Sequence, residues 1–470
     1  MITSPVFRGK RYAVLGLARS GAATVEALLA SGASVVAWDS DEAKRDAILP
    51  GTGRGTARKA SGGGGSMQST PLVESPLHHP ADGPPPRAGE ELTFADPLAI
   101  DLAGFEAVVV SPGVPLNRHP IAAKARDAGV PVIGDIELFA QARPSLPPHK
   151  VVGITGTNGK STTTALIHHI LETAGVPSLM GGNIGLPILS RAPLAEGGVY
   201  VLELSSYQID ITFTLDCDVA VLTNITPDHL DRYAGFEGYA ASKARLFAMQ
   251  SPDHGAVIAT EDDATRAIAD GLRAPAQEHA VTVVTSHDIA DQSRWPALQG
   301  PHNAQNAACA IAACRLLGLS HDAIEQGLRT YPGLPHRMER VAEKAGVLFV
   351  NDSKATNATA TAPALAAYPL IHWILGGLPK TDDLDDCKPH FDHVRAGYTI
   401  GEAGPMFARI LREAGKPVTE SITLDVAVRD AAAAARAGEV VMLSPACASF
   451  DQFSDYEARG EAFRAAVGAL

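Results

Sequence analysis

The chain has little cysteine and fewer basic than acidic side chains, and each shortage argues against a class of protein. Its 470 residues include 5 cysteines and no Cys-x-x-Cys pair, which favours reduced, structural cysteines over a disulfide framework. Lys and Arg total 39 against 52 Asp and Glu, a formal net charge of −13. A general nucleic-acid binder normally has a basic surface, so we expect no nucleic-acid partner. Small anions remain open as ligands, because backbone N–H groups and a few cations hold a phosphate.

Long hydrophobic runs are also absent. No run approaches 18 uncharged apolar residues, and residues 1–10 lack the apolar segment of a signal peptide. We therefore expect a soluble, cytoplasmic protein without membrane insertion. Separately, we expect it to be a monomer. Apolar residues are 46% and charged residues 19%, which is a globular composition. At about 150 residues per domain, the length corresponds to about three domains.

Short apolar runs rich in β-branched residues alternate with Ala/Leu-rich stretches of helical character. Strands buried on both faces read this way, so the pattern predicts an α/β protein with parallel sheets flanked by helices. The strand-like runs are residues 12–15, 34–38, 107–110, 151–154, 199–204, 219–222, 347–350, 371–375 and 440–443.

Proline-rich segments at residues 143–149 and 331–335 are candidate boundaries. We expect domains at residues 1–138, 139–332 and 333–470. Residues 51–90 are rich in glycine and proline and have almost no large apolar side chains. Such a segment buries too little surface to offset its ordering entropy, so we expect a mobile insertion there.

The strongest local motif is a strand, a glycine-rich turn and a helix start at residues 151–164. Ile154 stands where the strict phosphate-loop pattern has its first glycine, but Gly159, Lys160 and Ser161 are kept. Glycines let backbone N–H groups converge on phosphate oxygens, the lysine reaches the terminal phosphates, and the serine hydroxyl binds Mg²⁺. The alternative is an ordinary glycine-rich turn with a solvent-facing lysine.

A second glycine turn, at residues 16–21, resembles a dinucleotide-binding loop. Ala18 replaces the glycine that lets the chain approach a pyrophosphate, which disfavours NAD. Asp39 follows the second predicted strand, near where an acidic residue meets a ribose. A nucleotide pocket and a simple packing turn both remain open for this segment.

Seven stretches together resemble a known family. They are residues 153–164, 203–208, 224–233, 300–303, 334–337, 351–357 and 444–453. In order and composition they are similar to motifs of the Mur ligases, the ATP-dependent amide-forming enzymes of peptidoglycan precursor synthesis, and the last three favour the branch that adds D-glutamate. The resemblance implies a Rossmann-like N-terminal domain, a P-loop ATPase central domain and a Rossmann-like C-terminal domain. In that order, these would bind the UDP-substrate, ATP and the amino acid.

The family reaction implies the substrates and the cofactors. ATP activates the carboxylate of UDP-N-acetylmuramoyl-L-alanine as an acyl phosphate, and the amine of D-glutamate attacks it, with Mg²⁺ as the metal. The residues implied for ATP are Gly156, Thr157, Asn158, Gly159, Lys160, Ser161, Thr162, Asn303, Asn306, Arg337 and Asp352. Those implied for catalysis are Lys160, Glu203, His229, Lys243 and Arg337, and those for the metal are Ser161, Glu203, His229 and Lys243.

Two of these assignments rest on the resemblance against a simpler interpretation. Taken alone, Lys243 reads as a solvated lysine on a helix and His229 as a surface histidine. The family has a carbamylated lysine at the position of Lys243, which requires a depressed pKa because only the neutral amine takes up CO₂.

The remaining ligands are also implied by the resemblance. For the UDP-substrate it implies Gly16, Leu17, Ala18, Arg19, Ser20, Asp39, Ser40, Ser111, Gly113, Asn183 and His229. For D-glutamate it implies Lys354, Thr356, Lys380, Ser449 and Phe450. Lysines and hydroxyl or backbone donors suit a dicarboxylate.

Three alternatives stay open at this point. The first is another amide ligase, such as a folylpolyglutamate synthetase, a Mur ligase for a different amino acid, or a variant that uses L-glutamate. The second is a nucleotide-binding regulatory module without catalysis, and the third is a dehydrogenase that rests on residues 16–21 alone.

Overall fold

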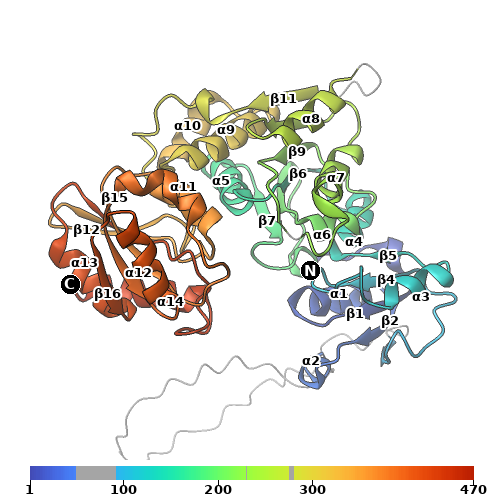
Figure 1. The fold of residues 1–470 in the computed structure, drawn as a ribbon. Helices are drawn as coiled ribbons and strands as arrows, with labels where there is room; N and C mark the ends of the chain where they lie inside the picture. Colours follow the sequence, from blue (N-terminus) through green and yellow to red (C-terminus); the bar gives the residue numbers. More distant parts are fainter. Residues whose placement is uncertain (49–90, 229, 275–279) are drawn as a thin grey trace, which may run out of the picture. The chain divides into compact units, whose positions relative to one another are not determined.

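The computed structural model describes residues 1–48, 91–228, 230–274 and 280–470. The expected mobile insertion at residues 51–90 lies outside the described residues. Among the described residues the strands form three sheets, each accompanied by helices (Figure 1), and the α/β class with three domains is confirmed. The chain divides into two compact units, Met1–Leu146 with Leu186–Pro193, and Pro147–Gly185 with Leu194–Leu470.

The first unit contains a parallel sheet in the order β3-β2-β1-β4-β5. The strands are β1 (Arg11–Leu15), β2 (Ser34–Trp38), β3 (Leu92–Phe94), β4 (Ala107–Val110) and β5 (Val132–Ile133). The helices are η1 (Pro5–Phe7), α1 (Arg19–Ala30), α2 (Glu42–Asp46), α3 (Ile121–Asp127), α4 (Asp135–Ala142), η2 (Arg143–Ser145) and η3 (Ile188–Ser190). Parallel strands end at one edge of the sheet, so the loops after β1, β2 and β4 meet there.

The second unit contains two sheets, of which the first has the order β11-β10-β9-β6-β8-β7 and is parallel. Its strands are β6 (His149–Thr155), β7 (Ser178–Gly182), β8 (Gly198–Glu203), β9 (Val219–Leu222), β10 (Gly255–Ala259) and β11 (Ala280–Val284). Its helices are α5 (Lys160–Thr173), α6 (Ser206–Asp210), α7 (Gly235–Ala248), α8 (Asp263–Leu272), η4 (Ser286–Asp288), α9 (Pro301–Leu316) and α10 (His321–Thr330).

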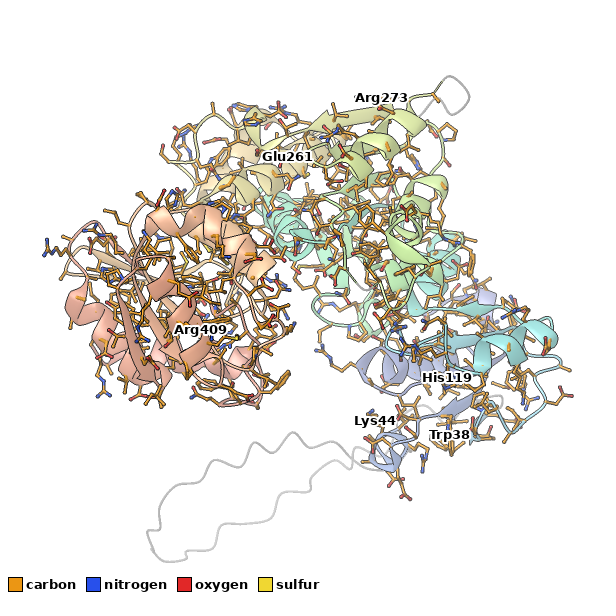
Figure 2. The ribbon with its side chains drawn as sticks, in the orientation of Figure 1. Trp38, Lys44, His119, Glu261, Arg273 and Arg409 are labelled. Carbon is orange, nitrogen blue, oxygen red and sulfur yellow. The ribbon has the colours of Figure 1, made fainter. Side chains whose placement is uncertain are left out.

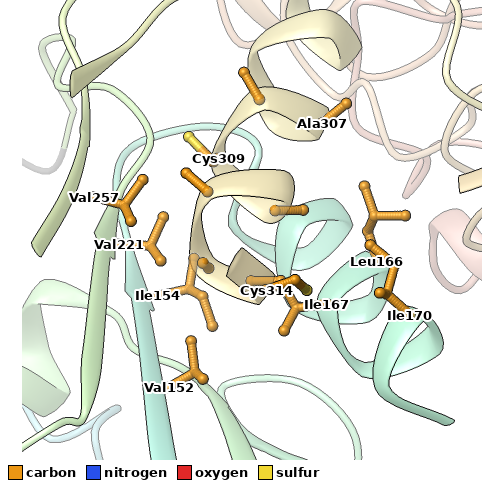
Figure 3. Close-up of a cluster of buried hydrophobic side chains, with 14 of the residues drawn as sticks. Val152, Ile154, Leu166, Ile167, Ile170, Val221, Val257, Ala307, Cys309 and Cys314 are labelled. Carbon is orange, nitrogen blue, oxygen red and sulfur yellow. The ribbon is translucent and has the colours of Figure 1, made fainter. Parts of the chain in front are cut away.

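A buried apolar cluster joins this sheet to helices α5 and α9. Figure 3 shows Ile154 and Val221 of the sheet facing Cys309 of α9, with Leu166 and Ile170 on α5. Full burial of a side chain of this size contributes about 1.5–3 kcal/mol relative to exposure. The cluster packs β6, the strand that leads into the phosphate loop, against helices α5 and α9.

The other sheet of the second unit has the order β12-β13-β17-β14-β15-β16. Its strands are β12 (Glu339–Lys344), β13 (Val347–Asn351), β14 (Ile371–Gly376), β15 (Val394–Ile400), β16 (Val418–Ile422) and β17 (Val440–Leu443). Its helices are α11 (Ala358–Leu365), η5 (Asp385–His393), α12 (Gly404–Glu413), α13 (Leu424–Ala434) and α14 (Tyr456–Gly468). The pairing of β12 with β13 is antiparallel, and the other pairings of this sheet are parallel.

The predicted strands agree with the structure where the run is buried on both faces. Each predicted run matches a strand to within about two residues at either end. Several strands were not predicted, among them the exposed edge strands β12 and β16, whose polar side chains break the apolar pattern. In the described ranges no helix combines the length and apolar character needed to span a membrane.

Candidate active site

The phosphate loop lies between β6 and α5 and is held by the end of strand β9. The N–H of Thr157 donates to the backbone oxygen of Asn224 at 2.8 Å, and the N–H of Asn158 donates to Oδ1 of the same residue at 2.8 Å. Thr223 Oγ1 donates to the backbone oxygen of Asn158 at 2.6 Å. These bonds fix the loop without using the N–H groups at the start of α5, which remain suited to an anion.

Two lysines converge on this loop. Nζ of Lys160 and Nζ of Lys243 donate to the same acceptor, the backbone oxygen of Gly156, at 2.9 and 2.7 Å. Lys243 is 1% exposed, so the simpler interpretation as a solvated helical lysine is wrong. Helix α7 turns this side chain into the protein, and Nζ lies 4.5 Å from the centre of the Tyr239 ring.

Burial makes both lysines easier to deprotonate. Burial lowers the pKa of Lys243 to about 6, and the nearby charge of Lys160 adds to the shift. The pKa of Lys160 is also lowered, mainly by burial, and the charge of Glu203 opposes that shift. An amine with a pKa near 6 is largely neutral at pH 7, which is the form that reacts with CO₂.

Glu203 ends strand β8 beside the phosphate loop and has unused acceptor capacity. Its side chain is 2% exposed. Oε1 accepts a hydrogen bond from Nδ2 of Asn183 at 2.9 Å, whereas the buried Oε2 has no hydrogen-bond partner among the described residues. A buried carboxylate oxygen without a donor is costly unless a cation or a ligand meets it.

The other predicted metal ligands are His229 and Ser161. His229 lies outside the described residues. Within the described ranges no group of three or more His, Cys, Asp or Glu side chains is arranged to hold a metal. Ser161 stands on the first turn of α5, where its hydroxyl accepts a hydrogen bond from Arg337. Among the residues that the structure describes, the candidate donors are the unpartnered Glu203 oxygen and the Ser161 hydroxyl, both oxygen atoms of the kind that Mg²⁺ prefers.

Arg337 precedes β12 in the chain and contacts the phosphate-loop helix α5 of the other sheet. Its Nη2 donates to Oγ of Ser161 at 3.1 Å. A cavity of about 140 Å³ lies here. Its lining includes Gly159 and Thr162 from the loop, Asn303 from α9, and Arg337 and Lys354 from the C-terminal part of the unit.

The asparagine pair on α9 and the acid after β13 also line this cavity. Nδ2 of Asn306 donates to Oδ1 of Asn303 at 3.1 Å, so the two lie on one helix face as their spacing predicts. Asp352 accepts hydrogen bonds from Ser444 Oγ at 2.8 Å and from the N–H of Met338 at 3.1 Å. Burial raises the pKa of Asp352 to about 7, although these donors and Arg337 oppose the shift.

The predicted D-glutamate residues mostly gather on adjoining loops. Nζ of Lys380 lies 3.3 Å from Oγ1 of Thr356. The loop of Lys380 pairs with the loop of Ser449, because Leu378 and Ala448 exchange two backbone hydrogen bonds at 3.0 Å. Phe450 is 68% exposed.

Two further residues of this region, Tyr456 and Arg459, were not predicted from the sequence. Nζ of Lys354 lies 3.6 Å from the centre of the Tyr456 ring, a cation–π contact. The buried guanidinium of Arg459 donates to the backbone oxygens of Ser353 at 2.9 Å and Cys447 at 3.0 Å. It thereby joins the two predicted amino-acid loops. Both residues lie in the first turn of α14, and no spacing pattern marks them in the sequence.

The loops of the first unit are closed by hydrogen bonds of their own. Both oxygens of Asp39 accept backbone N–H groups, from Leu17 at 2.7 Å and from Asp41 at 3.0 Å. Burial alone raises the pKa of Asp39, but these donors and Lys44, 3.6 Å away, lower it overall. Figure 2 labels Trp38 at the end of β2 and Lys44 on α2, the two elements that flank Asp39.

The other predicted UDP-substrate residues divide between the two units. Oγ of Ser111 donates to the backbone oxygen of Gly16 at 2.8 Å, which joins the loops after β1 and β4. Arg19 and Ser20 form the first turn of α1, and Ala18 caps it with extended backbone. Ser40 and Gly113 lie in the loops after β2 and β4 of the same unit, whereas Asn183 belongs to the second unit and contacts Glu203.

Comparisons with known proteins agree along the whole chain. Residues 154–314 match the family model of the Mur ligase middle domain, and residues 336–447 match that of the Mur ligase glutamate ligase domain. The chain is 61% identical to a Novosphingobium aromaticivorans protein over 100% of this chain and 97% of that protein. It is 59% identical to a Zymomonas mobilis protein over the full length of both. Both relatives are named UDP-N-acetylmuramoylalanine--D-glutamate ligase.

Solved structures support the fold. A UDP-N-acetylmuramate-alanine ligase from Thermotoga maritima superposes with a TM-score of 0.54 at 15% identity, over 98% of this chain and 99% of that one. A structure of UDP-N-acetylmuramoyl-L-alanyl-D-glutamate--2,6-diaminopimelate ligase gives a TM-score of 0.52 at 18% identity, over 78% and 92% of the two chains. With both family models matched and relatives of about 60% identity along the full length, the chain belongs to the Mur ligases, in the group of the D-glutamate ligases.

Proposed function

We propose that this ligase joins D-glutamate to UDP-N-acetylmuramoyl-L-alanine at the cavity beside the phosphate loop, with ATP and Mg²⁺. The observation that carries the proposal is the arrangement around Arg337. Its guanidinium meets Ser161 of the phosphate loop at 3.1 Å, and the same cavity is lined by Lys354 of the predicted amino-acid site. A nucleotide and an amino acid would therefore meet at one place, as an ATP-driven amide synthesis requires.

The proposed nucleotide site uses the loop and both sheets of the second unit. The N–H groups at the start of α5 and the ammonium of Lys160 would receive the phosphates of ATP. Arg337 adds a second cation that is always charged and has planar donors. Asn303, Asn306 and Asp352 would bind the nucleoside end, since all three line the same cavity.

The residues present fit a magnesium ion. The free Oε2 of Glu203 and the hydroxyl of Ser161 would hold it, with His229 as a further candidate from the resemblance. When bound, the metal would neutralise phosphate charge during phosphoryl transfer. Asn183 holds the other oxygen of Glu203 at 2.9 Å and so orients the carboxylate.

Lys243 is proposed to act as a carbamate. The buried neutral amine, with its pKa near 6, would add to CO₂ and lose one proton, which places an anion beside the cation of Lys160. The carbamate would then attract the ammonium group of Lys160, whose Nζ donates to the same backbone oxygen of Gly156. A buried carboxylate is also a suitable ligand for a second metal ion.

The proposed reaction has two steps. A carboxylate oxygen of UDP-N-acetylmuramoyl-L-alanine attacks the γ-phosphorus of ATP, the bond to the bridging oxygen breaks, and ADP leaves. The neutral amine nitrogen of D-glutamate then attacks the acyl carbon, phosphate leaves with the electron pair of the broken C–O bond, and the nitrogen loses one proton. Lys160 and Arg337 would stabilise the phosphate charge in both steps.

The amino acid is proposed to bind the loops of the C-terminal sheet. Lys354, Thr356, Lys380 and Ser449 supply ammonium and hydroxyl donors for two carboxylates, and the Lys380–Thr356 contact of 3.3 Å brings donors from two loops together. The backbone of Phe450 is also proposed to contact D-glutamate. The UDP end would bind the loops of the first unit, at Gly16, Leu17, Ala18, Arg19, Ser20, Asp39, Ser40, Ser111 and Gly113, with Asn183.

We also propose the location of the reaction, the domain bounds and the oligomeric state. The substrates, ATP and a UDP-linked sugar, are cytoplasmic metabolites, so we place the reaction in the cytoplasm. We keep the domains at residues 1–138, 139–332 and 333–470, and a monomer as the active form. Light scattering with and without substrates measures that state, and a stable dimer would contradict it.

The decisive experiment measures ADP release from ATP with UDP-N-acetylmuramoyl-L-alanine and either D- or L-glutamate. We expect release that depends on D-glutamate and on Mg²⁺. Release only with L-glutamate would contradict the proposed substrate. Nucleotide binding without any product at saturating substrates would instead support the regulatory module.

A further inference from the structure

Arg337 lies between two residues with unusual backbone conformations. The φ angle is 61° at His336 and 47° at Met338, a left-handed region that residues with a side chain rarely adopt. Such a conformation persists only where surrounding contacts hold it. The N–H of Met338 donates to Oδ1 of Asp352 at 3.1 Å, and the backbone oxygen of His336 accepts the N–H of Lys354 at 3.0 Å. The position of Arg337 therefore depends on the contacts of its two neighbours.

The side chain of His336 is itself held by several contacts. It is 5% exposed. Nδ2 of Asn351 lies 3.0 Å from its Nδ1, and its backbone N–H donates to Oε2 of Glu339 at 3.0 Å. The ring meets Tyr456 edge to face, with centroids 6.1 Å apart. His336 is thus enclosed by β12, β13 and the first turn of α14.

Gly460 completes the enclosure because it has no side chain. A Cβ atom built on Gly460 would lie 2.1 Å from Nδ1 and 2.7 Å from Cε1 of His336. Gly460 lies inside α14 without a positive φ, so the backbone does not need glycine there, and glycine weakens a helix. The imidazole of His336 occupies the missing volume, and this contact accounts for the glycine.

We propose that Gly460 is a positioning residue for the nucleotide: its missing side chain admits His336, and the enclosed His336 holds Arg337 toward Ser161. This inference rests on the proposed function, which assigns Arg337 to the phosphates of ATP. Arg459, the preceding residue, ties the loops of Ser353 and Cys447 together. One turn of α14 thus sets the nucleotide arginine and the predicted amino-acid loops at once.

The first test replaces Gly460 by alanine in the full-length protein. With Arg337 displaced, a charge-assisted contact is lost, so Kd for the non-hydrolysable ATP analogue AMPPNP with Mg²⁺ should rise about tenfold or more. KM for ATP should rise with it, while KM for UDP-N-acetylmuramoyl-L-alanine stays within about twofold. The matched control is Gly468→Ala at the end of the same helix, where an added Cβ meets no atom within 4 Å. It should bind AMPPNP like the parent.

The second test asks whether the effect passes through His336. In His336→Gly the ring is gone and glycine adopts the positive φ without strain. If Gly460 acts through that ring, adding Gly460→Ala to His336→Gly should change Kd for AMPPNP less than about twofold. The same loss in both backgrounds would overturn the inference. If Gly460→Ala alone does not fold, the double variant should fold and bind like His336→Gly, and a double variant that also fails to fold would count against the inference.

Arg337→Ala separates this inference from the proposed function. If Arg337→Ala leaves Kd for AMPPNP unchanged, the assigned role of Arg337 fails and the inference fails with it. If Arg337→Ala weakens binding and Gly460→Ala does not, only the positioning by Gly460 is overturned. Loss in both variants, with the larger loss in Arg337→Ala, supports both.

Discussion

At the scale of single residues, the most informative feature is a lysine buried beside another lysine. Lys243 is 1% exposed and shares an acceptor with Lys160. Burial penalises the charged form and the second ammonium repels it, so both effects act in the same direction. Proteins rarely bury an unpaired lysine for stability alone, which makes a chemical role the better explanation.

Replacing this lysine tests the role directly. Lys243→Ala should lower the rate of ADP release by about 100-fold or more, because an electrostatic group beside the transferred phosphate is removed. Added acetate or formate should restore part of the rate by supplying the missing carboxylate. The control Lys150→Ala removes an exposed lysine and should keep the parent rate. Full activity in Lys243→Ala would remove this residue from the site.

Asp352 yields a prediction about stability and pH. Burial raises its pKa to about 7, so between the ordinary pKa of an aspartate, about 4, and pH 7 the folded protein keeps a proton that the unfolded chain releases. Stability therefore falls as the pH rises through that window. In Asp352→Asn this contribution is absent.

The measurement is urea unfolding of parent and Asp352→Asn from pH 4.5 to 8. As the pH rises across this range, the free energy of unfolding of Asp352→Asn minus that of the parent should increase by more than about 1 kcal/mol. A gap that does not change with pH would contradict the raised pKa. Asp127→Asn, at an exposed position, serves as the control and should follow the parent.

At the scale of elements, helix α5 and the loop before it show how the sequence builds the phosphate site. Gly159 precedes the helix with φ of 83°, and a Cβ there would lie 2.2 Å from Oδ1 of Asn306. Gly175 follows the same helix with φ of 75°, but its Cβ would meet no atom within 4 Å. The two positions share the strain of a left-handed backbone and differ in the space around them.

This pair separates strain from crowding. Both Gly159→Ala and Gly175→Ala should lose about 1 kcal/mol of stability from the positive φ. Only Gly159→Ala should also raise KM for ATP, by about tenfold or more, because the added methyl group displaces Asn306 and the loop that faces the phosphates. Equal KM values in the two variants would show that the loop tolerates the displacement.

Sequence pattern predicted most of the fully buried strands, but it missed β10, which is also buried at every position. Strands such as β9 and β17 are buried at every position, and a continuous apolar run marks such strands. Edge strands such as β16 have exposed side chains that interrupt the run. Lys243 shows the same limit for the site, because helical periodicity does not reveal what packs over a single polar residue.

At the scale of the whole molecule, the proposed nucleotide site is formed by residues from both sheet regions of the second unit. The cavity is lined from the phosphate loop and α9 on one side and by Arg337, Asp352 and α11 on the other. The chain has a net charge of −13, so the local cations Lys160, Arg337, Lys354 and Lys380 must attract anionic substrates against the overall charge.

Hydrogen exchange tests this shared site. Saturating AMPPNP with Mg²⁺ should slow amide exchange both in residues 156–162 and in helix α11, since a ligand stabilises every element that it contacts. Protection of the loop alone would show that the C-terminal elements do not take part in nucleotide binding. Helix α3 of the first unit serves as an internal reference.

The sequence by itself determined the α/β class, the family and the residue types of the phosphate loop, because these depend on local periodicity and on contiguous motifs. Only the tertiary structure decided which polar groups are buried, which acceptors remain free and which glycines touch a distant side chain. The burial of Lys243, the Glu203 oxygen that no described residue meets with a hydrogen bond, and the contact of Gly460 with His336 all depend on atoms far apart in the chain. Desolvation and steric exclusion act between neighbours in space, and a linear pattern does not contain those neighbours.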